Sequence, residues 1–322
     1  MDNIKKILAI ETSCDDTSCA IIDSNKAIIA NIVQSQYDVH REYNGIVPEL
    51  ASRHHLENIN FIISEALVKA DCSFDDIDAI AVTVKPGLAG SLLVGVMTAK
   101  ALSYALKKPL IEIDHLDAHI WANFMKYKPN TEIFKPRFPA LVLLVSGGHT
   151  DLYFMNSYSD FYILGRTRDD AVGEAFDKVG KLLDLGYPGG PVIDKISAET
   201  TGRVTLPKPF MSHTYDFSFS GLKTAVLQVF KKKKFTLEDK HILAASFQDV
   251  VVEVLLRKMK KGIKEFGIQT IMLSGGVAAN SQLRDAVCKL AKDSMIACHF
   301  PPRPFCTDNA AMVGARAIDL IK

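Results

Sequence analysis

The sequence has almost no net charge. It contains 38 Lys and Arg side chains against 37 Asp and Glu, which gives a formal net charge of +1 at pH 7. A protein that grips nucleic acid through its phosphates alone carries a dense basic surface, and this balance excludes one. Any polynucleotide partner must therefore be met through a local patch or with the help of other subunits.

Cysteines and long apolar runs are also scarce. The six cysteines form no CxxC pair and no dense framework, and a chain of 322 residues can build its cores without disulfides. The first apolar run stops at Glu11, and no later run approaches the ~18 uninterrupted apolar residues of a membrane span. We therefore expect reduced thiols and a cytoplasmic protein without a membrane partner.

The common nucleotide-binding fingerprints are missing. No GxGxxG follows a strand-like segment with an acidic residue downstream. The glycine-containing segment 87–97 (GLAGSLLVGVM) has Val96 where a P-loop requires its lysine. A nucleotide, if one binds, is held in another way.

What is present is an alternation of strand-like and helix-like segments that starts again half-way along the chain. At roughly 150 residues per domain, the length predicts two domains. We expect strands at 6–10, 17–22, 26–33, 77–84, 109–113, 140–145, 151–155, 161–165, 269–274 and 295–299. We expect helices at 49–69, 91–107, 238–266, 280–292 and from Thr307 onward. The alternation predicts an α/β fold with mostly parallel sheets, weak similarity between the halves predicts a duplication, and 129–139 is the expected linker.

Three strand-to-turn junctions carry small polar residues: 11–18 (ETSCDDTS), 146–150 (SGGHT) and 274–280 (SGGVAAN). Glycines let a backbone approach a ligand closely and expose consecutive N–H donors, which suits phosphate or another anion. In open α/β sheets, ligands gather beyond the carboxyl ends of the strands, where these turns are expected. The alternative is that each is an ordinary tight turn, but two buried-strand–SGG motifs in one chain favour binding.

His115 and His119 form the strongest candidate for a metal site. Four residues apart, they share one face of a helix and can chelate one ion. Partly exposed histidines that only pack or cap are an equal alternative, and a zinc-protease helix is excluded because Leu116 stands where that signature needs Glu. Asp308 is the best candidate for a carboxylate ligand from a distant part of the sequence. We expect Thr307 to cap the last helix and Asp308 to lie in its first turn. An Asp is also favourable at that position without any metal, because it interacts with the helix dipole.

The segment 173–194 (GEAFDKVGKLLDLGYPGGPVID) joins a helix to a Pro-Gly-Gly turn. Its carboxylates Glu174, Asp177 and Asp194 are candidates to accept hydrogen bonds from sugar hydroxyls or from a ligand amine. Solvated charges on a helix face are the alternative reading.

Together these segments resemble the TsaD family, the bacterial tRNA adenosine threonylcarbamoyltransferases once described as glycoproteases. The resemblance covers nearly the whole chain. It rests on the ordered motifs ETSCDDTS, GIVPELASRHHLE, PGLAGSLLVG, HLDAH, LVSGGHT, GEAFDKVGKLL, YPGGPVID, FSFSGLKTAV, ASFQ, SGGVAANSQLR and CTDNAAM.

The resemblance implies an actin-like (ASKHA) α/β fold with two lobes, each a mixed sheet flanked by helices. It implies one lobe of 1–133 plus 300–322 with the metal ligands, and a second lobe of 134–299 with the substrate and nucleotide contacts. It assigns one divalent metal, usually iron with zinc possible, to His115, His119 and Asp308. It maps substrate contacts onto Leu144, Val145, Ser146, Gly147, Gly148, Asp177, Gly190, Asp194 and Asn280.

The implied activity is that of an acyltransferase. It moves the threonylcarbamoyl group from threonylcarbamoyl-AMP to N6 of adenosine 37 in tRNAs that read ANN codons (t6A formation), and AMP leaves. No catalytic residue stands out, and Glu11, Asp16 and Glu174 are the candidates for a general base. The implied partners are tRNA, a TsaB-like paralogue, TsaE-like ATPase subunits and an upstream TsaC-type adenylate synthase. A small-metabolite kinase or ATPase of the same fold, or a non-catalytic scaffold subunit, are the alternatives.

Three positions depart from the family pattern. Lys85 stands where GPGL usually begins with Gly, Asp114 stands where Asn is common before the first histidine, and Asp117 replaces the usual Glu. None of these changes removes a ligand. Lys85 and Asp114 place extra charge near the expected site, so we expect an effect on metal affinity or anion preference.

Overall fold

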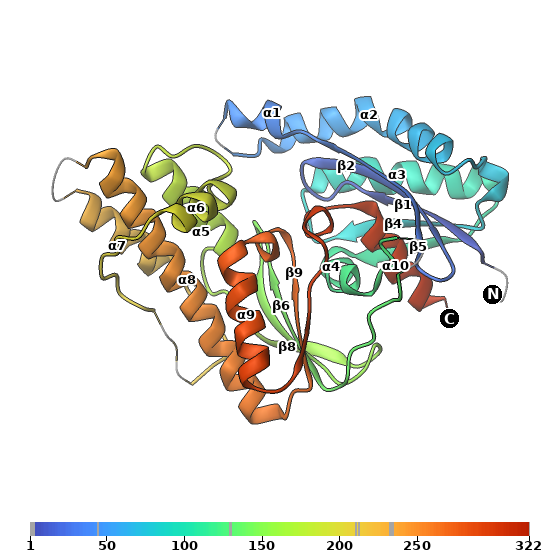
Figure 1. Cartoon of the computed structure of the whole chain (residues 1–322). Helices are drawn as coiled ribbons and strands as arrows, with labels where there is room; N and C mark the ends of the chain where they lie inside the picture. The colour runs from blue at the N-terminus through green and yellow to red at the C-terminus, as the bar shows by residue number, and fades with distance from the viewer. Residues whose placement is uncertain are drawn as a thin grey trace. The chain divides into compact units, whose positions relative to one another are not determined.

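The computed structural model describes residues 4–43, 45–128, 131–209, 211, 213–231 and 235–321. The chain divides into two compact units, Met1–Lys135 with Thr307–Lys322 and Pro136–Cys306 (Figure 1). The boundary between Lys135 and Pro136 falls inside the expected linker, of which residues 129 and 130 lie outside the described residues.

The first unit is built on a five-stranded mixed sheet in the order β3-β2-β1-β4-β5. β1 pairs antiparallel with β2, and β2 with β3, whereas β4 and β5 run parallel to β1. The strands are β1 (Lys6–Glu11), β2 (Asp16–Asp23), β3 (Ile28–Ser35), β4 (Ala79–Lys85) and β5 (Leu110–Asp114). The helical segments are α1 (Tyr37–Arg41), α2 (Pro48–Lys69), η1 (Phe74–Asp76), α3 (Ala89–Leu106), α4 (His115–Trp121), η2 (Ala122–Phe124) and α10 (Ala310–Leu320).

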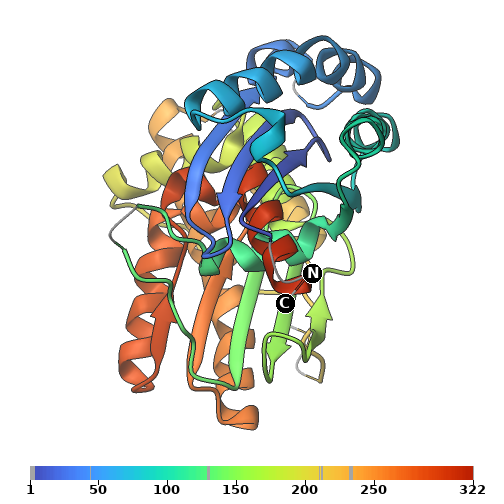
Figure 2. The ribbon, with the colours of Figure 1, turned by 90° about the vertical axis from the view of Figure 1, so that its right-hand side faces the viewer.

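Alternation along β1 explains how both faces of this sheet are covered. Leu8 and Ile10 join a buried apolar cluster with the side chains of α2 and α3. Ala9 points to the opposite face, where a Cβ on Gly314 of α10 would lie 3.3 Å from its own Cβ. Figure 2 shows α10, in red, beside the blue strands, so the C-terminal segment completes the first unit.

The second unit repeats this plan. Its sheet has the order β10-β9-β6-β7-β8, in which β6, β7 and β8 are antiparallel neighbours and β9 and β10 run parallel to β6. The strands are β6 (Ala140–Val145), β7 (Thr150–Met155), β8 (Phe161–Arg166), β9 (Thr270–Ser274) and β10 (Ala297–His299). The helical segments are α5 (Val172–Leu182), α6 (Gly189–Glu199), α7 (Ser220–Phe230), α8 (Leu237–Phe266), η3 (Gly276–Ala279), α9 (Ser281–Asp293) and η4 (Arg303–Phe305).

The two sheets share one topology, three antiparallel strands followed by two parallel ones. The prediction of an α/β chain with two mixed sheets flanked by helices is confirmed. The expectation of mostly parallel sheets was wrong, because short polar turns after β1, β2, β6 and β7 return the chain directly and need no crossover helix.

The start of the last helix differs from the prediction. α10 begins at Ala310, and its cap is Asn309, whose Oδ1 accepts a hydrogen bond from Met312 N at 3.1 Å. Thr307 is therefore not the cap, and Asp308 lies before the helix and outside its first turn. A helix-dipole role for Asp308 consequently loses its basis.

Within the described residues, one helix is long and apolar enough to cross a membrane by length and composition. It is α3, with a mean hydropathy of 1.4 over its 18 residues. α3 packs against α2 and β4 in the first unit. A single helix of this kind is weak evidence for a membrane span.

Candidate metal centre and ligand-binding turns

α4 presents the two histidines. Its cap is Asp114, the last residue of β5, whose Oδ1 accepts hydrogen bonds from Leu116 N (2.9 Å) and Asp117 N (3.4 Å). His115 and His119 then lie on the same face one turn apart, with ring centroids separated by 4.6 Å. Their exposed fractions are 7% and 1%, so the alternative of partly exposed histidines does not hold.

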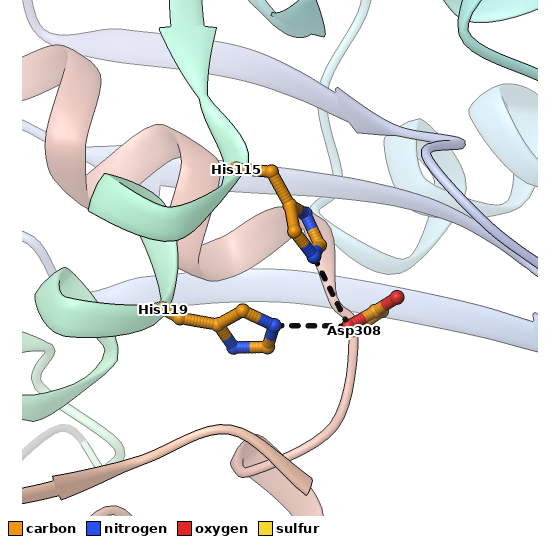
Figure 3. A group of neighbouring side chains, drawn as sticks. All are labelled: His115, His119 and Asp308. Atoms are coloured by element: carbon orange, nitrogen blue, oxygen red, sulfur yellow. Dashed lines mark ion pairs between the residues drawn. The ribbon is translucent and has the colours of Figure 1, made fainter. Parts of the chain in front are cut away.

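Asp308 reaches the same place from the far end of the sequence. Its Oδ1 lies 3.1 Å from Nε2 of His119 and 3.6 Å from Nε2 of His115 (Figure 3). One ligand atom from each of the three residues lies within 4.8 Å of the others. The start of α10 is fixed to the first sheet by a hydrogen bond from Ala310 N to Ser18 Oγ of β2, at 2.9 Å. This bond also positions Asp308, which lies just before the helix.

A contact between α4 and α10 fixes the positions of these two helices relative to each other. The Arg316 guanidinium lies 3.8 Å from the centroid of the Trp121 ring and forms an ion pair of 2.9 Å with Asp117. Asp117, one of the departures from the family pattern, therefore has a structural partner on α10. Lys85 and Asp114 likewise face each other, with 3.9 Å between Nζ and Oδ2. Their opposite charges offset one another beside the site.

Glu11 orients His115 from the side opposite Asp308. Glu11 has no exposed surface, and its Oε2 lies 3.1 Å from Nδ1 of His115. The same oxygen accepts a hydrogen bond from Thr83 Oγ1 (2.5 Å), and Oε1 accepts one from Ser13 N (2.5 Å). With a proton on Nδ1, His115 can donate to Glu11, and the lone pair of Nε2 faces Asp308 once Nε2 has lost its own proton.

The charges around the histidines shift several pKa values. Burial disfavours the charged form of His115, but the carboxylates of Glu11 and Asp308 outweigh it and raise its pKa to about 9. Burial alone would raise the pKa of Glu11, yet the charge of His115 and its hydrogen bond hold it below the usual value. Burial, together with Asp308 and Asp15 nearby, raises the pKa of Asp16 to about 7.

The three side chains fit a divalent cation. Neither ring nitrogen of His119 has a hydrogen-bond partner in the described part of the chain, although Nε2 faces Asp308. Because buried polar groups normally have a partner, this imidazole can accept a further ligand. Two imidazoles and one carboxylate are the donor set that iron and zinc accept, and three protein ligands leave positions for substrate or water.

The glycines of segment 87–97 serve packing. A Cβ on Gly87 would lie 2.5 Å from Ser13 O, and one on Gly95 would lie 2.3 Å from Thr12 Oγ1. Leu88 N also donates to Ser13 O at 2.8 Å. These glycines let α3 and its preceding loop approach the turn after β1 closely.

The two SGG turns lie together at one edge of the second sheet. β6 and β9 are parallel neighbours, so Ser146 and Gly275 follow adjacent strand ends. Gly275 has φ +86° and sits so close that a Cβ would lie 2.4 Å from Val145 O. Around Gly147 and Gly148, by contrast, added Cβ atoms would meet nothing within 4 Å among the described residues. The first turn is thus open to a ligand while the second is packed.

The remaining residues implied by the resemblance surround this edge. Gly173 N donates to Ser146 O at 3.2 Å, which brings α5 and Asp177 to the first turn. Asp177 Oδ1 accepts from Gly189 N at 2.7 Å, just before Gly190 at the start of α6. Leu144 and Val145 have no exposed surface and are paired within the sheet, so the structure leaves neither residue open to a ligand.

Asp194 and Asn280 are joined through a residue that the sequence reasoning missed. Gln248 of α8 hydrogen-bonds to both, at 3.2 and 2.8 Å. Its signal in the sequence is a polar side chain on the apolar face formed by Ala244, Val251 and Leu255. Glu174 lies apart from this network, exposed and paired with Lys178 at 2.8 Å.

Known proteins resemble the chain over nearly its full length. The family model described as "TsaD: tRNA N6-adenosine threonylcarbamoyltransferase" matches residues 27–315. A protein of that name from Thermosipho africanus (strain TCF52B) is 49% identical over 321 residues, covering 98% of this chain and 94% of its own. Another from Clostridioides difficile (strain 630) is 47% identical over 311 residues, covering 95% and 90%.

Among solved structures, component A of the (R)-2-hydroxyglutaryl-CoA dehydratase of Acidaminococcus fermentans is similar with a TM-score of 0.57. Its sequence identity is 15%, and 98% of each chain is covered, so the likeness concerns the fold alone. The prediction of an actin-like fold is confirmed. From the match over 27–315 and these close relatives, the chain belongs to the TsaD family, the tRNA N6-adenosine threonylcarbamoyltransferases.

Proposed function

We propose that the chain is a tRNA-modifying acyltransferase that moves the threonylcarbamoyl group from threonylcarbamoyl-AMP to N6 of adenosine 37 in tRNAs that read ANN codons. AMP is the leaving group. The observation that carries this proposal is the meeting of His115, His119 and Asp308 from two distant parts of a chain that belongs to the TsaD family. The small-metabolite kinase and the scaffold subunit are not favoured by the relatives, which carry the transferase name.

The proposed cofactor is one divalent metal held by His115, His119 and Asp308, with Fe²⁺ as the preferred ion and Zn²⁺ as an acceptable one. When bound, it would act as a Lewis acid toward substrate oxygens. Glu11 would hold His115 in the tautomer that a metal requires.

The proposed substrate contacts belong to the second unit. The open turn at Gly147 and Gly148 offers backbone N–H groups to the phosphate of the adenylate. Asp177 and Asp194 would accept hydrogen bonds from its hydroxyl groups, beside Gly190 and Asn280. The proposed division is a metal-holding lobe, 1–133 plus 300–322, and a substrate-holding lobe, 134–299. It differs from the compact units mainly at residues 300–306, which belong to the second unit.

Of the three candidate bases, Asp16 fits best. Attack by the adenosine amine requires the loss of a proton, and a general base works well when its pKa lies near the working pH. Asp16, with a pKa of about 7, has a buried Oδ1 without a hydrogen-bond partner among the described residues. Glu11 is occupied by three hydrogen-bond contacts, and Glu174 is paired with Lys178.

The proposed partners are tRNA, a TsaB-like paralogue and TsaE-like ATPase subunits, with a TsaC-type synthase supplying the adenylate in the cytoplasm. The near-neutral charge supports a need for other subunits in tRNA binding. Exposed apolar side chains along α3, at Leu93, Met97 and Tyr104, support a protein partner on that helix.

The deciding experiment incubates the protein with threonylcarbamoyl-AMP and tRNA, with and without the candidate partners, and analyses the nucleosides by mass spectrometry. We expect t6A with the native chain and its loss, together with loss of bound metal, in His115→Ala. His54→Ala, on α2 outside the cluster, is the matched control and should keep both. Full modification by His115→Ala with unchanged metal content would refute the proposal.

A further inference from the structure

Gln248 is a buried amide in a helix that is otherwise apolar on that face. It lies on α8 with 1% of its surface exposed. A buried primary amide is costly unless its donors and acceptor are satisfied, so its partners define its role. All of its partners lie on α6 or around the start of α9, two elements that pack against α8 (Figure 1).

The partners form a directed chain of hydrogen bonds. Leu283 N donates to Asn280 Oδ1 at 2.8 Å, and Asn280 Nδ2 donates to Gln248 Oε1 at 2.8 Å. Gln248 Nε2 then donates to Asp194 Oδ1 at 3.2 Å and to Gln282 Oε1 at 2.8 Å. The chain runs from the backbone of α9 to the carboxylate on α6.

Only one orientation of the Gln248 amide is compatible with these neighbours. Turned over, its oxygen would face the oxygens of Asp194 and Gln282, and its nitrogen would face the amide nitrogen of Asn280. The backbone donor at Leu283 fixes Asn280 in turn. Asp194 receives a second hydrogen bond from Ser281 N at 2.9 Å, which leaves one lone pair on each carboxylate oxygen for a ligand.

We propose that Gln248 is a positioning residue for the adenylate substrate, because it sets the orientation of both Asp194 and Asn280. This inference rests on the proposed function, in which those two residues contact the substrate. Gln248 itself does not touch the ligand. It holds the carboxylate of Asp194 as an acceptor for ligand O–H groups and keeps the amide of Asn280 from rotating.

The test measures AMP binding to the full chain by titration calorimetry, and the KM and kcat for threonylcarbamoyl-AMP, in Gln248→Leu and Gln248→Glu. Both variants lose the donor to Asp194, while Gln248→Glu keeps an acceptor for Asn280. Ser246→Ala is the matched control. Ser246 lies on the same helix, is 2% exposed, and accepts a hydrogen bond from Val204 N at 2.8 Å. Thermal unfolding of each variant reports its stability.

We expect both Gln248 variants to weaken AMP binding about tenfold and to raise KM more than they lower kcat. Ser246→Ala should lose stability without losing affinity. In an Asp194→Ala background, Gln248→Leu should add little to the loss, because both changes remove the same contact.

Two results would overturn the inference. If Gln248→Leu binds AMP as the native chain does, or if its effect adds fully to that of Asp194→Ala, Gln248 serves stability alone. If the native chain neither binds AMP nor modifies tRNA, the proposed function fails, and this inference fails with it.

Discussion

Glu11 shows how one buried carboxylate can orient a histidine of a candidate metal site. It accepts hydrogen bonds from Thr83 and Ser13 and still lies within 3.1 Å of His115. A residue with so many partners cannot easily shuttle protons, but it can fix an imidazole in place. This separates the role of Glu11 from that of Asp16, although both were candidates for the same task.

Glu11→Gln should weaken metal binding about tenfold. The substitution replaces the charged carboxylate that orients His115 by a neutral amide. It also removes one carboxylate that raises the pKa of His115, which reduces competition by the proton and keeps the loss moderate. Competition titration of Co²⁺ against a chelator at pH 8 measures the effect. Glu174→Gln is the matched control, and an unchanged Co²⁺ affinity in Glu11→Gln would contradict the positioning role.

The pKa of His115 also predicts how metal binding depends on pH. In the metal-free protein His115 is protonated below about pH 9, and a metal can bind Nε2 only after the proton leaves. The apparent association constant for Co²⁺ should therefore rise about tenfold per pH unit up to pH ~9 and then level off. Titrations between pH 6 and 10 measure this. A constant affinity across that range would show that His115 carries no competing proton.

At the scale of elements, the two turns that share the residues SGG differ in their surroundings. Gly275 adopts φ +86° against the end of β6, whereas a Cβ added at Gly147 or Gly148 would meet nothing within 4 Å in the part of the chain that the structure describes. Sequence patterns cannot separate these cases, because the difference depends on which turn packs against its neighbouring strand. The structure assigns packing to one turn and accessibility to the other.

Gly275→Ala should destabilise the fold by about 2 kcal/mol, since its Cβ would meet Val145 O and its backbone angle suits glycine. Gly148→Ala should stay within about 0.5 kcal/mol of the native stability. If Gly148 lies beside the adenylate, that second variant should nonetheless bind AMP more weakly. Urea unfolding and calorimetry separate the two effects, and equal stabilities for both variants would count against the assignment.

The elements were largely predictable because hydrophobic periodicity is a local property. The expected strand 77–84 is observed at Ala79–Lys85, and the expected helix 238–266 at Leu237–Phe266. The start of α10 was missed because Thr307 and Asn309 are both good capping residues, and only the contacts of Asn309 decide between them. Gln248 was missed because its partners are on other elements, and periodicity does not detect such pairs.

At the scale of the whole molecule, the repeat of one topology in two sheets is the main feature. Each unit has three antiparallel strands followed by two parallel ones. The spacing of His115 and His119 predicted that they share one face of a helix, but it left metal binding and simple packing as equal alternatives. Asp308 could not, since its arrival beside α4 depends on α10 packing against the first sheet at Ala9 and Ile22. For this candidate ligand, the family resemblance supplied what spacing could not.

The near-zero net charge of the whole chain predicts how strongly it binds tRNA. With 38 basic and 37 acidic residues, the isolated chain has little excess positive charge to release counterions from tRNA. We expect it to bind tRNA weakly, and the complex with the proposed partner subunits to bind at least about tenfold more tightly at the same salt concentration. Fluorescence anisotropy with labelled tRNA, repeated across a salt series, gives both affinities.

The salt dependence identifies the source of the gain. If partner subunits contribute basic side chains, the plot of log affinity against log salt should be steeper for the complex than for the isolated chain, because more phosphates are neutralised. A variant of the isolated chain with the charge reversed at an exposed acidic residue, such as Glu57→Lys on α2, controls for non-specific attraction between the protein and tRNA. Equal affinities and equal slopes with and without partners would mean that this chain alone provides the tRNA surface, through a local basic patch.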